Sequence, residues 1–248
     1  MALSAVIITK NAAAQLGECL ASVGFADEIL VVDSGSTDAT CDLARAHGAR
    51  VMHQAWLGYG AQKQFAVEAA VHDWVLCVDA DERVSPELRA SIARELAAPR
   101  ARVYAFARCN RFLGRWLRHG EGYPDWSVRL FRRGHARWSD DPVHEKVVTA
   151  EAVHRLDGDL MHDSAETLEK YLDKQNSYTT LQAETLRAAG RRASLAHLAL
   201  SPLFRFLKFY VLRLGFLDGT AGLVHIAIGC MNSFNKYAKL IALERAGR

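Results

Sequence analysis

The chain has 248 residues, of which half are apolar and 24% are charged. That composition is typical of a globular protein and excludes an intrinsically disordered chain. The formal net charge of +3 is too small to indicate nucleic-acid binding, so we predict no nucleic-acid partner. The five scattered cysteines form no C-x-x-C pair, which argues against a zinc site or disulfide framework and favours a reduced compartment. The first residues lack the pattern of a signal peptide, and we expect a buried strand there.

The first half of the chain alternates short apolar runs with stretches of helical spacing. The runs predict buried strands at residues 5–9, 28–33, 50–53 and 74–79. The stretches between and after them predict helices at residues 12–23, 37–47 and 59–71, with a further helix opening at Ser85-Pro86. Strands and helices that alternate at these lengths indicate βαβ units and a mostly parallel sheet.

The pattern changes along the second half. Residues 103–108 and 127–131 continue with strand character, separated by a connection too long for a simple turn. From about residue 166 helical segments dominate, and we expect breaks near Gly190, Pro202 and residues 215–219. We therefore predict an α/β domain over residues 1–165 and a helical region over residues 166–248.

Two of the apolar strands each end in an aspartate. The second strand leads into Asp33-Ser-Gly-Ser-Thr-Asp, and the fourth leads into Asp79-Ala-Asp81-Glu82. Ligands of open α/β sheets bind at the carboxyl ends of the strands, near the point where the strand order reverses. We therefore expect Asp33 and the Asp79/Asp81 pair to share one cleft.

The D-x-D pair suits a hard divalent cation. Mg²⁺ is commonly held by one or two carboxylates together with substrate phosphates. Asp79 and Asp81, two residues apart at a strand end, meet that requirement. The alternative is a polar strand end whose acids cap the next helix.

The turn after Asp33 has a different chemistry. Its carboxylate is able to accept hydrogen bonds from a ribose or a base. Ser36 lies in the small, flexible turn that opens the predicted helix, whose N-terminal amides favour anions. The alternative is an ordinary capped β–α turn.

Together the segments I-I-T-K-N, E-I-L-V-V-D-S-G-S-T-D and W-V-L-C-V-D-A-D-E resemble glycosyltransferase family 2. The resemblance implies the GT-A fold, a Rossmann-like mixed and mostly parallel sheet, and an inverting transfer from a nucleotide-sugar donor with a divalent metal, Mg²⁺ or Mn²⁺. The donor site that it implies includes Thr9, Asn11, Asp33, Ser36, Lys63 and Asp79. For Lys63, a solvated helix face is an equal alternative.

Inversion by direct displacement needs a base near the acceptor hydroxyl. The stretch R-W-S-D-D-P-V-H-E-K-V holds most candidates, and similar H-E pairs follow an R-L-F-R strand in several family members. We predict Glu145 as the base and Asp141 as the second choice. The alternative for Glu145 is an ion pair with Lys146 or Arg129. The remaining candidates are Asp125, Asp140 and His144.

Other residues of the middle segment are candidates for the donor or the metal. By resemblance, a late histidine often completes the metal site, and here His162 is the candidate, with Asp163 beside it. Arg129 and Arg132 carry guanidinium groups that suit phosphates. Aromatic side chains that stack on sugars or pack in the core are Trp116, Tyr123, Trp126 and Trp138.

Residues 195–216 have about the length of a membrane span, but Pro202 and three basic residues interrupt them. On a helix, Phe204 and Leu207 share a face with other apolar side chains, whereas Arg205, Lys208 and Arg213 lie largely on another. This pattern predicts a helix lying at an anionic membrane surface. A helix packed on the catalytic domain is the alternative.

The C-terminal segments K-Y-L-D-K-Q-N-S-Y-T-T, F-Y-V-L-R-L-G-F-L-D-G and N-K-Y-A-K-L resemble a bacterial subgroup of the same family that includes lipopolysaccharide core β-1,4-glucosyltransferases. The resemblance implies transfer of glucose from UDP-glucose to a lipid A-linked inner-core acceptor, by an enzyme peripheral on the cytoplasmic face of the inner membrane. Transfer to a polyprenyl phosphate or another envelope glycan is the first alternative. A phosphoryl-transfer enzyme is a distant alternative. The D-x-D-x-T/V motif of such enzymes requires Thr or Val two residues after the second aspartate, where this chain has Arg83.

Overall fold

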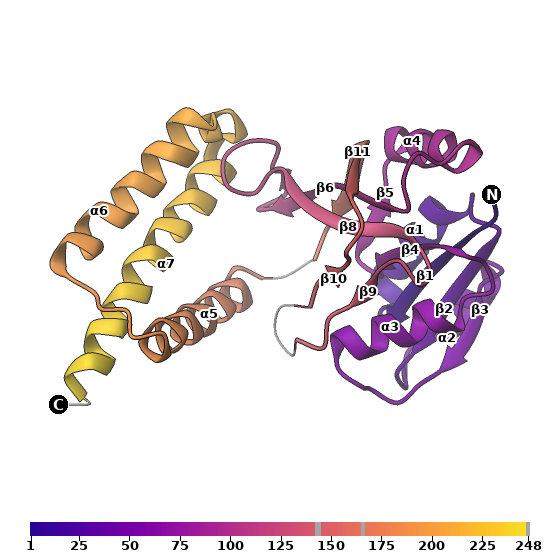
Figure 1. The fold of residues 1–248 in the computed structure, drawn as a ribbon, viewed down its shortest axis with the longest axis horizontal. Coiled ribbons are helices and arrows are strands. Elements are labelled where there is room, and N and C mark those ends of the chain that lie inside the picture. Colours follow the sequence, from indigo (N-terminus) through magenta and orange to yellow (C-terminus); the bar gives the residue numbers. More distant parts are fainter. Residues whose placement is uncertain (142–144, 165–166, 247–248) are drawn as a thin grey trace. The chain divides into compact units, whose positions relative to one another are not determined.

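The computed structural model describes residues 1–141, 145–164 and 167–246, and the chain divides into two compact units. The first unit comprises Met1–Arg108 and Asp125–Asp163, and the second comprises Cys109–Pro124 and Ser164–Arg248. Figure 1 shows a mixed sheet with helices in the first unit and long helices in the second. The 109–124 segment, which the sequence analysis placed with the α/β domain, belongs to the helical unit.

Four parallel strands form one half of the sheet in the order β3-β2-β1-β4. Their bounds are Arg50–His53, Glu28–Asp33, Leu3–Thr9 and Trp74–Asp79. The sheet continues as β8-β6-β11-β5, with β8 antiparallel to β4 and to β6, and β11 antiparallel to β5. The bounds of these strands are Asp125–Arg132, Val103–Phe112, Val153–His162 and Glu82–Val84. The sheet is therefore mixed, with its parallel strands together in one half, and it agrees with the sheet that the GT-A resemblance predicted.

Alternation along the central strands explains why both faces of the sheet are covered. In β1, Leu3, Ala5 and Ile7 enter one core and Val6 enters the other. The first core is shared with α1 (Ala13–Val23) and α4 (Pro86–Ala97), and the second with α3 (Tyr59–Ala69). Since the side chains of a strand point to alternate faces, an almost wholly apolar strand needs helices on both sides.

The helix after β2 begins later than the sequence analysis predicted. α2 spans Thr40–Ala46 rather than residues 37–47. The turn before it is held by other groups: Asn11 Oδ1 accepts a hydrogen bond from Thr37 N at 2.8 Å, and Asp38 Oδ1 accepts one from Thr40 N at 3.0 Å. The predicted anion site at a helix N-terminus beside Ser36 is therefore wrong, because no helix starts there.

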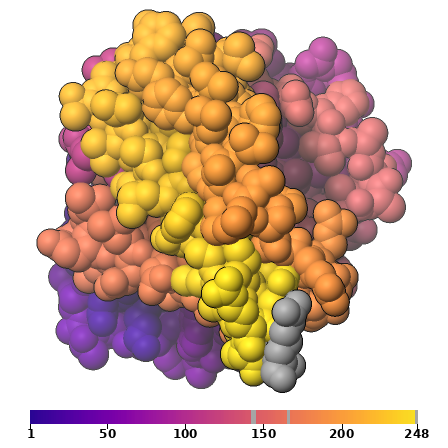
Figure 2. Space-filling model, turned by 90° about the vertical axis from the view of Figure 1, so that its left-hand side faces the viewer, coloured from indigo at the N-terminus to yellow at the C-terminus, as the bar shows by residue number. Residues whose placement is uncertain are grey.

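Short strands and long helices complete the chain. In the first unit, β9 (Arg137–Trp138) pairs with β10 (Val147–Val148), and in the second, β7 (Arg115–Trp116) pairs with the end of β6. The helices of the second unit are α5 (Leu168–Ala188), α6 (Leu195–Phe206), the π-helical turn η1 (Leu207–Leu212), the 3₁₀ turn η2 (Gly215–Asp218) and α7 (Gly219–Ala246). Figure 2 shows α6 and α7 lying side by side. The predicted break at Pro202 is wrong, since that residue lies inside α6.

A buried aspartate ties the 109–124 segment to the helices of its own unit. Asp218, 2% exposed, accepts hydrogen bonds from the backbone nitrogens of Arg118 (3.0 Å) and His119 (2.8 Å). Its other oxygen lies 3.0 Å from His119 Nδ1. A buried carboxylate needs such partners, because an unpaired one is costly. The segment is therefore an integral part of the helical unit.

Candidate active site

Acidic residues meet at the carboxyl edge of the parallel strands. β1 lies between β2 and β4, with Thr9 opposite Asp33 on one side and Ile8 opposite Asp79 on the other. Asp33 and Asp79 are therefore two strand spacings apart, about 10 Å along the sheet. The predicted common edge for these two aspartates is present in the structure.

Asp33 is engaged by the turn that follows it. Its Oδ2 accepts hydrogen bonds from Gly35 N (2.9 Å) and Ser36 N (2.8 Å), and its Oδ1 accepts from the hydroxyls of Thr9 and Ser36. Burial raises the pKa of this carboxyl, but these four hydrogen bonds outweigh it and hold the pKa below its usual range. Asp33 therefore stays ionised and gives the turn its shape.

Asn11 joins the loops that leave β1 and β2. Its backbone N donates to Ser36 Oγ at 2.8 Å, and its φ of 52° places it in the left-handed region, where asparagine is among the better tolerated residues. With the hydrogen bond between Asn11 and Thr37, this contact brings the predicted nucleoside-binding residues Thr9, Asn11, Asp33 and Ser36 into one hydrogen-bonded group.

Asp79 sits between two cations. Lys63 Nζ lies 3.0 Å from Asp79 Oδ1, and Arg129 Nη2 lies 3.0 Å from Asp79 Oδ2. Arg129 also contacts Glu82, which is fully buried and accepts a hydrogen bond from Asp79 N at 2.9 Å. Burial raises the pKa of Asp79, but the charges of Arg129 and Lys63 outweigh it and keep the pKa well below its usual range.

Glu82 was not assigned a role from the sequence, although it directly follows the D-x-D motif. Burial raises its pKa, and Arg129 and Arg108 oppose that effect. Arg108 Nη1 lies 3.7 Å from Glu82 and its guanidinium also binds Asp125. The only sequence signal for Glu82 is its place at the start of a short strand after Asp81. Asp125, a candidate base, is taken up by the ion pair with Arg108.

Asp81 lies beside His162 and not beside Lys63 and Arg129, the two cations that contact Asp79. His162 Nε2 is 3.3 Å from Asp81 Oδ2, and the two side chains are 21% and 29% exposed. Strand pairing explains the meeting, since β11 places His162 opposite Glu82. The Asp81 carboxylate is an oxygen donor of the kind that Mg²⁺ and Mn²⁺ prefer, and the His162 imidazole lies next to it as a nitrogen donor.

The metal prediction required Asp79, Asp81 and His162 on one ion. Among the residues described, no three His, Cys, Asp or Glu side chains surround a common point. An ion held by Asp81 and His162 would therefore take its other ligands from water and from diphosphate oxygens, which is common for Mg²⁺. The donor set fits a divalent ion on those terms.

Glu145 approaches the same group from a different segment. Its Oε1 lies 3.2 Å from Lys63 Nζ, so the predicted base and the first aspartate of the D-x-D motif share one lysine. This ion pair differs from the alternatives considered for Glu145, which were Lys146 and Arg129. Asp141 is exposed, Asp140 is paired with Arg137 at the surface, and His144 lies outside the described residues.

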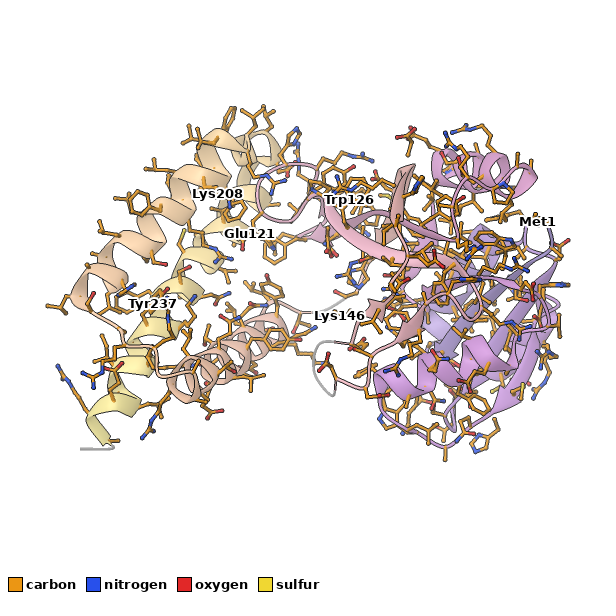
Figure 3. All side chains as sticks on the ribbon, viewed as in Figure 1. Met1, Glu121, Trp126, Lys146, Lys208 and Tyr237 are labelled. Carbon is orange, nitrogen blue, oxygen red and sulfur yellow. The ribbon has the colours of Figure 1, made fainter. Side chains whose placement is uncertain are left out.

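The aromatic and basic candidates divide between places. Trp138 is buried and covers Lys63 Nζ (4.6 Å from the ring centroid) and Arg129 (5.3 Å). Trp126, labelled in Figure 3, is 41% exposed and carries Arg155 on its ring. Trp116 and Tyr123 belong to the helical unit.

Arg132 lies away from the acidic edge. It is opposite Trp74, at the amino end of β4, and it pairs with Asp73 at 3.1 Å. The predicted phosphate role of Arg132 is therefore wrong, whereas Arg129 remains at the site because it lies three residues nearer the carboxyl end of β4.

A mixed sheet with an acidic edge of this kind marks the GT-A class of fold. The sequence profile of Glycosyl transferase family 2 matches residues 4–155. The chain is 33% identical, over 96% of its length and 91% of the relative's, to the lipopolysaccharide core biosynthesis glycosyltransferase LpsC of Rhizobium meliloti. It is 32% identical to the uncharacterized glycosyltransferase RT0209 of Rickettsia typhi, over 99% of this chain and 89% of that one.

The chain therefore belongs to glycosyltransferase family 2 and is a glycosyltransferase. Among solved structures it resembles residues 1–349 of TarS from S. aureus in complex with UDP-GlcNAc, with a TM-score of 0.51 and 15% identity over 100% of this chain and 93% of that one. That likeness shows the fold. Family membership sets aside the distant alternative of a phosphoryl-transfer enzyme.

Proposed function

We propose that the protein transfers glucose from UDP-glucose, with inversion, to a lipid A-linked acceptor of the lipopolysaccharide inner core. The observation that carries this proposal is the 33% identity to LpsC over nearly the whole of both chains, together with the charged group at the acidic edge. Transfer to a polyprenyl phosphate or another envelope glycan is the alternative, and it would use the same donor site.

The donor is assigned to the acidic edge by chemistry. The nucleoside side is formed by Thr9, Asn11, Asp33 and Ser36. There a ribose hydroxyl would replace the Ser36 hydroxyl as a hydrogen-bond donor to Asp33, so that the carboxylate would keep all its hydrogen bonds. Asp79 and Arg129 form the diphosphate side, and Lys63 contacts it through Asp79. The guanidinium of Arg129 supplies positive charge where the departing diphosphate gains negative charge.

A divalent ion, Mg²⁺ or Mn²⁺, held by Asp81 and His162 would act as a Lewis acid toward the diphosphate. Glu145 takes the proton from the acceptor hydroxyl, whose oxygen attacks the anomeric carbon from the side opposite the nucleotide, and UDP leaves. Asp141 is the second choice for the base. The buried ring of Trp138 shields the Lys63 end of this group from water.

A donor screen tests the assignment. Purified enzyme with Mn²⁺ or Mg²⁺ is given UDP-glucose, UDP-galactose, UDP-N-acetylglucosamine or GDP-mannose, with truncated lipopolysaccharide or polyprenyl phosphate as acceptor. We expect sugar transfer with UDP-glucose and truncated lipopolysaccharide. Product on polyprenyl phosphate alone would favour the alternative, and transfer of none of these sugars by folded protein would contradict both.

We propose that the protein lies on the cytoplasmic face of the inner membrane, and the helical unit supports a membrane contact. The stretch Leu195–Leu212 is long and apolar enough to cross a membrane by length and composition, with a mean hydropathy of 1.3, and none of it is buried within the structure. At 1.5 Å per residue its 18 residues reach about 27 Å. The exposed large apolar side chains of this stretch are Leu195, Leu200, Leu203, Phe204, Leu207, Val211 and Leu212.

Arg205 does not add to the positive surface as the sequence analysis predicted. Its guanidinium turns inward and pairs with Glu121, and its Nη1 donates to Ser233 Oγ at 3.1 Å. The charge of Arg205 is therefore withdrawn from the outward side of α6, whereas Lys208 on η1 is exposed. α7 adds exposed Leu223, Met231 and Phe234. An apolar surface with a few cations fits the boundary between acyl chains and acidic headgroups.

Vesicle flotation tests this assignment with a matched pair of leucines. Leu207 on η1 is 44% exposed and Leu181 on α5 is 38% exposed. We expect Leu207→Glu to abolish flotation with phosphatidylglycerol vesicles and Leu181→Glu to leave it intact. Equal behaviour of the two variants would contradict a membrane face on α6. Self-association of the wild type that excludes vesicles would instead assign the face to a second copy.

A further inference from the structure

Helix α3 holds the segment that carries Glu145 through one of its faces. Residues 60, 63 and 64 lie on one side of the helix because their spacing is three and four. A Cβ at Gly60 would lie 2.1 Å from the carbonyl oxygen of Ser139, so only glycine allows this approach. Gln64 Oε1 accepts a hydrogen bond from Trp138 N at 3.0 Å, and Lys63 reaches Glu145.

The segment also closes on itself behind Glu145. Ser139 N donates to the carbonyl oxygen of Lys146 at 2.8 Å, and Lys146 N donates to Ser139 Oγ at 3.1 Å. Trp138 and Val147 pair as neighbouring short strands. Ser139 and Lys146 are thus held to each other, and Lys63 is the cation that contacts the Glu145 side chain.

The ammonium of Lys63 is enclosed. The residue is 7% exposed, its Nζ lies 3.0 Å from Asp79 and 3.2 Å from Glu145, and the Trp138 ring covers it at 4.6 Å. A lysine that binds a donor phosphate directly would be expected to present its ammonium to the open edge. Here two carboxylates from different parts of the chain take up that charge.

We propose that Lys63 is a positioning residue that fixes the base Glu145 relative to Asp79 at the end of β4. The inference rests on the proposed function, because it takes Glu145 as the base. A glutamate side chain loses rotamer freedom when it is held in one place. An ion pair to a buried lysine on α3 orders this side chain before the acceptor binds. The carboxylate is then already positioned beside the place where the acceptor hydroxyl must lie.

Kinetics separate this role from direct donor binding. We expect Lys63→Met to lower kcat about 100-fold, the size expected from a small misplacement of a catalytic group, with the dissociation constant for UDP changed less than threefold. In the Glu145→Gln background, Lys63→Met should then have almost no further effect on kcat, because the group it positions is gone. A large loss of UDP binding, or full additivity with Glu145→Gln, would overturn the inference.

Arg129 supplies the matched comparison. It also pairs with Asp79, but among the described residues its second ion-pair partner is Glu82 and not Glu145. Arg129→Lys should therefore lower kcat additively with Glu145→Gln, unlike Lys63→Met. If both cations behave alike, Lys63 acts through Asp79 only and the inference is wrong.

Hydrogen exchange gives a readout that needs no turnover. In Lys63→Met the amides of Trp138, Ser139 and Lys146 should keep their protection from exchange if the hydrogen bonds between Ser139 and Lys146 alone hold the segment. A Gly60→Ala variant should lose that protection. The inference requires Gly60→Ala to lower kcat as Lys63→Met does, with UDP binding intact, since both displace Glu145. Normal turnover in Gly60→Ala with lost protection would overturn it. Normal turnover in Glu145→Gln alone would instead remove the proposed base.

Discussion

The two units each enclose an arginine with carboxylates, and they do so to opposite effect. In the sheet unit Arg129 gathers Asp79 and Glu82 at the edge where Lys63 and Glu145 also meet, so charge is concentrated. In the helical unit Arg205 is paired with Glu121, so charge is removed from an apolar surface. The same kind of ion pair therefore concentrates charge at the candidate site of one unit and withdraws it from an apolar face in the other.

We expect the largest effect from a change of the proposed base, Glu145, in the sheet unit. Glu145→Gln keeps the size of the side chain but accepts no proton, and we expect kcat to fall about 10²- to 10⁴-fold. UDP binding, measured by calorimetry, should be unchanged. Asp141→Asn is the control, and a reversal of the two results would give the role to Asp141.

The helical unit offers a change of similar size in stability. Gly229 on α7 leaves room for the ion pair, since a Cβ there would lie 2.3 Å from Glu121 Oε2 and 2.9 Å from Arg205 Nε. Gly229→Val should lower the free energy of unfolding by about 2–3 kcal/mol in a urea titration. Ala227→Val, at an exposed position of the same helix, should have little effect. A neutral Gly229→Val would mean that the ion pair is not packed as described.

A third experiment tests whether the metal is bound by Asp81 and His162 or by Asp79 at the same edge of the sheet. Asp81→Asn and His162→Ala should each weaken Mn²⁺ binding in the presence of UDP roughly 10- to 100-fold, judged by the losses seen for metal-site residues. Asp140→Asn, at the surface beside Arg137, serves as the control. Full Mn²⁺ affinity in both variants would place the ion elsewhere, with Asp79 as the next candidate.

The smallest expected effects come from the cations of the apolar face. Lys208→Gln and Arg213→Gln should each weaken binding to phosphatidylglycerol vesicles about fivefold, which corresponds to about 1 kcal/mol per charge. Arg45→Gln, in an exposed pair with Asp42 on the sheet unit, should change nothing. Equal loss in all three variants would point to net charge rather than to this surface.

The parallel half of the fold could be predicted from the sequence because its inner strands β1, β2 and β4 are largely apolar and buried. Arg50–His53, Glu28–Asp33 and Trp74–Asp79 match the predicted strands residue for residue. β11 was missed, since Val153–His162 is largely polar and interrupted by Gly158. The site could also be predicted only in part. The strand ends predicted where the aspartates lie, but contacts between distant parts of the chain determine which residues they pair with.

Two further differences come from contacts that no local pattern encodes. The inward turn of Arg205 depends on Glu121, which lies 84 residues away in the chain. The contact between Lys63 and Glu145 spans 82 residues. Helical spacing had placed Arg205 with the outward cations, because periodicity shows which residues share a face but not which face is covered.

The exposed leucines and phenylalanine of α6 also bear on how the protein behaves in a test tube. In plain aqueous buffer other copies of the chain would cover that surface. We expect the apparent mass in sedimentation experiments to rise with protein concentration and to fall to that of a single copy once a mild detergent is added above its critical micelle concentration. Storage and assay conditions would then determine how many enzyme molecules are free to meet a bilayer.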